Sequence, residues 1–344
     1  MNYRMPKYVP GEARSWALAS LEGCCGCVLP TFTSDLGGLN EVAIRHDVQR
    51  EKDLGMKAVL IVSEGGTTEG EYNAFVDMVV DESGDDLVTF VHASQPTFDD
   101  MIRVIEYAQR AGVDLVLPSY PATYYPTSYD QIFADTKRVL DSTQLGVFIF
   151  CIDQWNFARL HPAGFPVDLL ARLIDACPNL AGIKNEVGLP YAGGLVDVFE
   201  KFRDVVVVTD PLEYNAPIWI RNYGMRFMGT SNYEAMGDAI PRILRLLAAE
   251  ATWDVGMDLY WKMAPVRRAN SAIGSATVAL TSLVPRIVWK YQGWLVGFNG
   301  GPLRSPQQRI NHAQMLQMRG AATAAGLPVT SAPDEEFFVG RNPA

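Results

Sequence analysis

The feature that most constrains the fold is a repeated alternation of short apolar runs and amphipathic stretches between residues 20 and 232. Apolar runs of this length, flanked by polar loops, are typical of strands that are buried on both faces, as in parallel sheets. Eight such runs occur, at residues 26–30, 58–62, 87–91, 114–118, 146–150, 180–184, 205–209 and 226–230.

The stretches between these runs have the pattern of helices. Residues 98–112 form an amphipathic segment that ends on Gly112, as a helix C-cap does. Residues 166–177 form another, with Pro166 well placed for a first helical turn. Strands that alternate with helices predict an α/β fold with a parallel sheet, and eight of them predict a (β/α)8 TIM barrel. The alternative is an open doubly wound sheet, but its usual GxGxxG and GxxxxGK[ST] signatures do not occur.

The alternation covers only part of the chain, and this suggests a division into three regions. We expect an irregular N-terminal arm over residues 1–20, a catalytic barrel over 21–235 and a helical C-terminal extension over 236–344. The last region has helical patterns without further strand signals, so we place the chemistry in the barrel.

Composition excludes several classes of protein. With 48% hydrophobic and 20% charged residues, the chain can bury a sizeable core and is not disordered. The net charge of −10 and the absence of a dense Lys/Arg run argue against nucleic-acid binding. No apolar run approaches the ~20 residues that cross a bilayer, and the N-terminus resembles no signal peptide. Five cysteines without such a signal indicate reduced thiols and a cytoplasmic protein.

Lys184 is the sharpest candidate for chemistry, because it closes the apolar run LAGIK at the end of the sixth expected strand. Active sites of such barrels lie at the C-terminal ends of the strands. Burial there disfavours the ammonium form and lowers the pKa of a lysine toward neutrality. The free amine is then a nucleophile that forms a Schiff base with a carbonyl. The alternative is a structural lysine that pairs with a nearby carboxylate such as Glu186.

Two loops at strand ends offer further polar groups. The glycine-threonine segment 65–68 presents backbone N–H groups and two hydroxyls that can hold a carboxylate, although an ordinary turn has the same composition. Gly66 and Thr67 are therefore candidates for substrate binding, as is Gly229 in the eighth run. Tyrosines 120, 124 and 125 follow the fourth strand and could relay a proton or simply pack.

A metal site is not expected. The cluster Cys24-Cys25-Gly26-Cys27 lacks a downstream partner motif, so these residues are better explained as small strand residues. With four scattered histidines and no HExxH motif, a catalytic zinc is not expected either.

Taken together, these motifs resemble the dihydrodipicolinate synthase / N-acetylneuraminate lyase family. The similar features are GGTTEGE after the second strand, a tyrosine-proline loop after the fourth and PNLAGIK at the sixth. GFNGGPLRSP near the C-terminus is similar to the family's Gly-Gly-Pro-x-Arg-x-Pro segment. The resemblance covers roughly residues 20–320.

The resemblance implies both an assembly and a set of roles. It implies a tetramer built from dimers, with Lys184 as the Schiff-base lysine that captures pyruvate or another 2-oxo acid. Thr67 and Thr68 match the hydroxyl pair that holds the pyruvyl carboxylate, and Thr68 joins a proton relay. A loop tyrosine, Tyr124 or Tyr125, completes that relay across a dimer interface; we take Tyr124 as the catalytic candidate.

The sequence departs from the family pattern at three places. Glu69 interrupts the Gly-Thr-Thr-Gly-Glu motif. Phe150 stands nearest the position of the family's proton-shuttling tyrosine, and a phenylalanine cannot transfer a proton. The arginine that binds a second carboxylate in the synthases is missing after that position, and Arg159 comes several residues later.

These observations predict a Schiff-base lyase or aldolase that needs no metal or organic cofactor. Its substrates would be a 2-oxo acid and an aldehyde, with an aromatic aldehyde favoured by the aromatic strand-five loop. A sugar-acid dehydratase that uses the same lysine is one alternative. A non-catalytic regulatory barrel that binds 2-oxo acids is the other.

Overall fold

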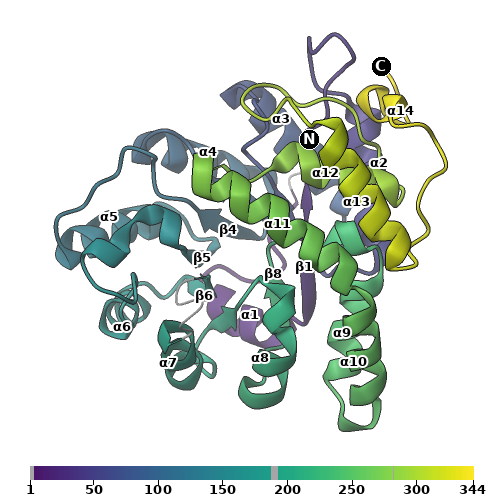
Figure 1. The fold of residues 1–344 in the computed structure, drawn as a ribbon. Helices are drawn as coiled ribbons and strands as arrows, with labels where there is room; N and C mark the ends of the chain where they lie inside the picture. Colours follow the sequence, from purple (N-terminus) through teal and green to yellow (C-terminus); the bar gives the residue numbers. More distant parts are fainter. Residues whose placement is uncertain (1–3, 187–192, 282) are drawn as a thin grey trace. The chain divides into compact units, whose positions relative to one another are not determined.

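The computed structural model describes residues 4–186, 193–281 and 283–344 (Figure 1). Its eight strands lie in one sheet in the order β7-β6-β5-β4-β3-β2-β1-β8. This order, with helices between successive strands, is that of a (β/α)8 barrel, and the predicted fold class is confirmed. The strands are β1 (Gly23–Val28), β2 (Ala58–Ile61), β3 (Val88–Ala93), β4 (Leu115–Pro118), β5 (Gly146–Cys151), β6 (Leu180–Asn185), β7 (Val207–Thr209) and β8 (Phe227–Gly229).

The helices alternate with the strands and then continue alone to the C-terminus. The first eight are α1 (Ala13–Ser20), α2 (Glu41–Leu54), α3 (Glu69–Ser83), α4 (Phe98–Ala111), α5 (Tyr129–Asp141), α6 (Val167–Ala176), α7 (Gly193–Phe202) and α8 (Ala216–Tyr223). The predicted helical C-terminal region is confirmed as α9 (Ala239–Leu247), α10 (Trp253–Lys262), α11 (Ala264–Thr281), α12 (Arg286–Leu295), α13 (His312–Ala324) and α14 (Glu335–Val339). Within the described part of the chain, no helix combines the length and apolar character of a membrane span.

Two local predictions are confirmed and one is wrong. Helix α4 ends at Gly112, which adopts the left-handed conformation with φ of 84°. Helix α6 begins directly after Pro166. The irregular N-terminal arm is wrong for residues 13–20, which form α1. This short helix has no side-chain N-cap, and contacts with distant residues stabilise it. The guanidinium of Arg14, in its first turn, donates to the carbonyl oxygens of Ile174, Cys177 and Leu180.

The chain forms two compact units, residues 1–22 with 88–230 and residues 23–87 with 231–344. In the first unit, the rings of Phe90, Phe148 and Phe227 contact one another, with centroids 5.1–6.2 Å apart. Gly182 on β6 makes room for this layer, since a Cβ there would lie 2.4 Å from the Phe148 ring. The boundaries at residues 20 and 235 that the sequence suggests remain predictions.

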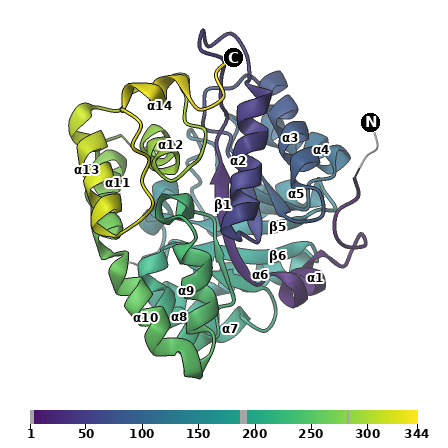
Figure 2. The ribbon, with the colours of Figure 1, turned by 90° about the vertical axis from the view of Figure 1, so that its right-hand side faces the viewer.

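The second unit holds β1, β2 and the C-terminal helices. Strands β1 and β2 pair in parallel, with Cys25 opposite Ala58. Figure 2 shows α11, α12 and α13 close together, and α9 beside α10. Tyr291, Trp294 and Phe337 are fully buried at the centre of the cluster that α11–α14 enclose.

Candidate active site

Lys184 lies near the C-terminal end of β6, with its side chain 6% exposed. Side chains alternate along a strand, so Lys184 shares a face of the sheet with Gly182. Its register partners are Phe150 on β5 and Thr209 on β7. The Lys184 Nζ lies 3.8 Å from the centroid of the Phe150 ring and 3.0 Å from Glu186 Oε1. The ion pair that the sequence left as the alternative is therefore present, in a buried setting that also suits a nucleophile.

Acidic side chains follow β5, β6 and β7. Asp210, directly after β7, is fully buried and accepts hydrogen bonds from Leu212 N (2.8 Å), Asn215 Nδ2 (2.8 Å) and Trp219 Nε1 (2.6 Å). Burial raises the pKa of Asp210 to about 7, and the charge of Glu186 adds to this rise.

The pKa values of two further groups, Asp153 and Tyr214, are also raised. Burial, with the charge of Glu186, raises the pKa of Asp153, which lies in the turn after β5. Burial and the charges of Asp210, Glu213 and Glu186 raise the pKa of Tyr214 to about 12. The pKa values of three groups around Glu186 are thus raised, and Glu186 is the carboxyl group that pairs with Lys184.

Aromatic rings form one side of this site. Trp155 Nε1 donates to the carbonyl oxygen of Phe150 at 2.7 Å, and the two rings meet edge to face with centroids 5.6 Å apart. Tyr120 lies against Trp155 at 5.9 Å and against Phe157 at 5.0 Å. The strand-five loop therefore packs as an apolar wall next to Phe150.

The predicted catalytic Tyr124 belongs to the same aromatic cluster. Its ring stacks on Tyr120 at 5.4 Å, and its hydroxyl donates to Asp135 Oδ2 on α5 at 2.9 Å. Burial and the Asp135 carboxylate raise the pKa of this phenol above its ordinary value. A role for Tyr124 in proton transfer stays a prediction.

Tyr125, the other loop candidate, is 66% exposed. The guanidinium of Arg159 lies 3.7 Å from the centroid of its ring and donates to the carbonyl oxygen of Pro126. Arg159 is therefore held by the loop that follows β4.

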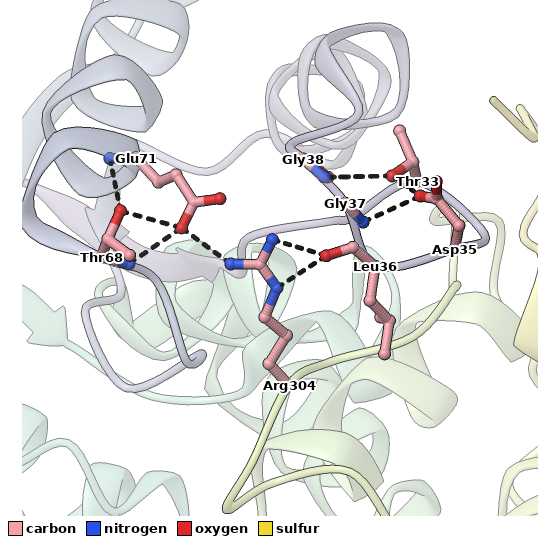
Figure 3. Close-up of polar contacts among 8 residues, drawn as sticks. All are labelled: Thr33, Asp35, Leu36, Gly37, Gly38, Thr68, Glu71 and Arg304. Atoms are coloured by element: carbon pink, nitrogen blue, oxygen red, sulfur yellow. Dashed lines mark hydrogen bonds and ion pairs between the residues drawn. The ribbon is translucent and has the colours of Figure 1, made fainter.

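The glycine-threonine loop lies in the second unit, between β2 and α3. Thr68 is the N-cap of α3: its Oγ1 accepts from Glu71 N at 3.2 Å, and Glu71 Oε2 accepts from Thr68 N at 2.9 Å (Figure 3). Such a reciprocal capping box satisfies two N–H groups at the helix start. The structure thus gives Thr68 a structural role, beside the catalytic one that the resemblance implies.

Arg304, from the C-terminal Gly-Gly-Pro-x-Arg-x-Pro segment, completes this arrangement. Its NH1 donates to Glu71 Oε2 at 2.7 Å, and its Nε donates to the carbonyl oxygen of Leu36 at 3.0 Å (Figure 3). Gly66 has φ of 81°, and a Cβ there would lie 2.6 Å from Arg304 Cβ. Two motifs of the resemblance therefore pack against each other, and Gly66 is required for that contact.

Gly229 ends β8, and its N–H donates to Thr209 Oγ1 on β7 at 3.2 Å. Lys184, Tyr124 and Gly229 belong to the first unit, while Gly66, Thr67 and Thr68 belong to the second. The binding roles of Gly66, Thr67 and Gly229 remain predictions.

The cysteine cluster lies on β1, and its three buried cysteines form no disulfide. Burial raises the pKa of Cys24 and Cys25, which makes them unreactive. Across residues 4–186, 193–281 and 283–344, no three His, Cys, Asp or Glu side chains are placed to hold a metal ion.

A buried carboxyl pair beside Gly26 could not be predicted from the sequence. A Cβ on Gly26 would lie 2.5 Å from both Glu51 Oε2 and Glu234 Oε1. Burial raises the pKa of both carboxyl groups, that of Glu234 to about 7. Sequence reasoning also missed Asp210, although a polar residue directly after an apolar run, here 205–209, is expected at the C-terminal end of a strand.

The chain is similar in sequence to two groups of enzymes. No protein-family model matches the chain. It is 20% identical to a 4-hydroxy-tetrahydrodipicolinate synthase of Methanopyrus kandleri, over 72% of this chain and 81% of that protein. It is 25% identical to a 5-dehydro-4-deoxyglucarate dehydratase of Pseudomonas putida, over 76% of this chain and 82% of that protein.

Solved structures share the fold. A dihydrodipicolinate synthase from Aquifex aeolicus matches 90% of this chain and all of its own, with a TM-score of 0.73 and 15% identity. The N-acetylneuraminate lyase from Fusobacterium nucleatum matches 88% of this chain and 98% of its own, with a TM-score of 0.70 and 14% identity. The resemblance inferred from the motifs is therefore confirmed: the chain is related by sequence and fold to the dihydrodipicolinate synthase / N-acetylneuraminate lyase family.

Proposed function

We propose that the chain is a class I lyase that forms a Schiff base between Lys184 and a 2-oxo acid derived from pyruvate. The observation that carries this proposal is the placement of Lys184, a buried lysine at the C-terminal end of a barrel strand. Glu186 Oε1 lies 3.0 Å from Lys184 Nζ, so an acidic group stands beside the atoms that would react.

The proposed reaction is reversible cleavage of a carbon–carbon bond. Lys184 Nζ attacks the C2 carbonyl, water leaves, and the resulting iminium accepts the electron pair of the C3–C4 bond as an aldehyde departs. Protonation of the enamine and hydrolysis then release pyruvate and the free lysine. Positioning of the carboxylate governs which bond aligns with the iminium. We assign that positioning to Thr67 and the adjacent N–H groups, because Thr68 Oγ1 caps α3.

A second candidate is dehydration of a sugar acid through the same lysine. The observation in its favour is the similarity to the Pseudomonas putida dehydratase over three quarters of the chain. In that reaction the bond that breaks next to the iminium is a carbon–oxygen bond, and the hydroxyl takes up a proton and leaves as water. A binding protein that forms the iminium without turnover is the remaining alternative.

Product analysis separates these candidates. We expect wild-type protein to release pyruvate from the 4-hydroxy-2-oxo acid formed by pyruvate and benzaldehyde, and Lys184→Met to release none. Lys201→Met is the matched control, since Lys201 is half exposed and pairs only at 3.9 Å with Asp168. Cleavage by Lys184→Met would overturn the lysine mechanism. Turnover of 5-dehydro-4-deoxyglucarate alone would favour the dehydratase, and trapping without turnover would favour a binding protein.

A further inference from the structure

The proposed mechanism leaves one step without a group to perform it. The iminium on Lys184 must exchange a proton with carbon C3, or with the hydroxyl on C4, and the family resemblance places a tyrosine at the end of strand five for this purpose. Phe150 stands there in register with Lys184, and its ring lies 3.8 Å from Nζ. A phenyl ring has no proton to exchange.

We propose that Glu186 is the proton-transfer group of this site, in place of the strand-five tyrosine. Its Oε1 lies 3.0 Å from Lys184 Nζ, and its side chain is 19% exposed. Carbon C3 of a bound 2-oxo acid is two bonds from Nζ once the iminium has formed. A carboxylate at hydrogen-bond distance from Nζ is therefore within reach of C3 and of a hydroxyl on C4.

The backbone holds Glu186 at this place. Its N–H donates to the carbonyl oxygen of Cys151 at 2.8 Å, which ties the exit of β6 to the end of β5. Glu186 is thus anchored on one side, while its side chain turns toward the lysine. A group that is fixed in this way keeps its distance to the reacting atoms during turnover.

Other acidic side chains of this unit have hydrogen-bond partners of their own or are exposed. Asp210 accepts three hydrogen bonds and is fully buried. The hydroxyl of Tyr124 donates to Asp135. Asp153, in the turn after β5, is an exposed residue. Among the residues that the structure describes, Glu186 is the acid in direct contact with Lys184 Nζ.

The proton transfer balances with these groups alone. In the cleavage direction, the Glu186 carboxylate takes the proton of the C4 hydroxyl; the oxygen electron pair forms the aldehyde C=O, the C3–C4 bond breaks, and its electrons pass through C2 to the iminium nitrogen. The Glu186 carboxyl then returns the proton to C3 of the enamine. Water hydrolyses the new iminium, which gives pyruvate and the lysine amine.

This inference rests on the proposed function, and the two can be tested separately. Exchange of the pyruvate methyl protons for deuterium, followed by NMR, reports proton transfer at C3. Borohydride trapping at equilibrium, followed by mass spectrometry, reports the iminium. We expect Glu186→Gln to keep the trapped adduct on Lys184 and to slow exchange about 10²–10⁴-fold. Formate should restore part of the exchange in Glu186→Ala, since it supplies a carboxylate to the emptied position.

Glu200→Gln is the control for loss of a carboxylate, because Glu200 is an exposed residue of α7. It should exchange at the wild-type rate. An intact adduct with wild-type exchange in Glu186→Gln would overturn the role of Glu186 and leave the Schiff base standing. Loss of the adduct itself in Glu186→Gln would make Glu186 a positioning residue, which also overturns the proposal. Wild-type protein that forms no adduct with pyruvate would refute the proposed function, and this inference with it.

Discussion

Two contacts of Lys184 define its surroundings. Glu186 Oε1 lies 3.0 Å from Nζ, and the centroid of the Phe150 ring lies 3.8 Å from it. Both groups attract a cation, and contacts of a cation with an aromatic ring contribute about 0.5–2 kcal/mol. The carboxylate that we assign to the later proton transfer is therefore also the ion-pair partner of the lysine.

The Phe150 position gives the first residue-scale prediction. We expect Phe150→Tyr to leave iminium formation intact and to change C3 proton exchange by about tenfold or more, because a phenol then lies near the reacting carbon in addition to Glu186. Phe150→Leu is the control, since it removes the ring without adding a hydroxyl. Trapping and exchange kinetics measure the two steps. If Phe150→Tyr leaves every rate unchanged, Phe150 is only a wall residue.

The second residue-scale prediction concerns the aldehyde. A substrate carboxylate needs a cationic or hydrogen-bonding partner, whereas the side chains after β5 and β6 include the acids Asp153 and Glu186. Arg159 is engaged with Tyr125 and Pro126. We therefore expect a higher kcat/KM for benzaldehyde than for aspartate semialdehyde as acceptor for pyruvate. Arg159→Ala should change neither value by more than about threefold, as for other surface substitutions. A preference for the semialdehyde that disappears in Arg159→Ala would contradict this.

At the residue scale, the sequence predicts which residues belong to the candidate site better than it predicts which residues they contact. Lys184 could be found because a charged residue rarely closes an apolar strand, and Glu186 because it lies two residues away. The partners of Tyr124 and Arg159 could not be found, because each depends on how a loop folds onto a distant segment. Arg304 and Glu71 are 233 residues apart in the chain, and Glu51 and Glu234 meet only through the fold.

At the scale of elements, the two threonines of the motif have different positions relative to α3. Thr68 is the N-cap of this helix, and Thr67 is the residue before it. We expect Thr68→Ala to destabilise the protein by about 1 kcal/mol, the usual cost of losing an N-cap, and Thr68→Ser to restore most of it. Thr67→Ala should change stability little, because Thr67 does not cap the helix, and should instead weaken pyruvate trapping. Urea unfolding and the pyruvate concentration for half-maximal trapping measure the two effects. Equal losses of stability in both alanine variants would contradict this division.

Glu51 on α2 and Glu234 in the turn after β8 form a buried carboxyl pair beside β1. This pair makes the free energy of unfolding depend on pH. The folded-state pKa of Glu234 is about 7, above the ordinary value of 4.5. The folded protein therefore binds this proton more tightly than the unfolded chain. The contribution of this bound proton to the free energy of unfolding is therefore fully present below about pH 4.5, and it is lost as the pH rises through about 7. At about 1.4 kcal/mol per pKa unit, the loss is on the order of 3 kcal/mol.

Glu234→Gln tests this prediction, because glutamine keeps the shape of the side chain and cannot ionise. We expect the free energy of unfolding of the wild type, measured with urea, to fall between about pH 5 and pH 8. The fall should be smaller in Glu234→Gln, and Glu51→Gln is the matched variant on the other partner. Equal pH dependence in the wild type and both variants would show that the pair does not hold an extra proton.

The strands were easier to predict than the short helices, for a physical reason. A buried parallel strand must be apolar on both faces, so all eight are visible as apolar runs. Helix α1 has only eight residues and no side-chain cap, and it depends on the hydrogen bonds that Arg14 makes with distant carbonyl oxygens. Tertiary contacts of this kind leave no local signal.

For the whole molecule, the order of elements carries more information than sequence identity. Solved structures that are only 14–15% identical match with TM-scores of 0.70–0.73, because the barrel needs apolar strands and helices in order but few particular residues. The chemistry depends on those few residues. The resemblance implies a tetramer built from dimers, and this assembly remains a proposal, as does the contribution of Tyr124 or Tyr125 across an interface.

Borohydride trapping tests the central claim most directly. Protein incubated with pyruvate and reduced with borohydride should gain the mass of one reduced pyruvyl group, and peptide mapping should place that group on Lys184. Lys184→Met should show no adduct, whereas Lys201→Met should keep it. Lys290 of α12 is buried and unchanged in all three proteins, so it is the control for reaction at another buried lysine. An adduct on another lysine, or one that survives in Lys184→Met, would contradict the account.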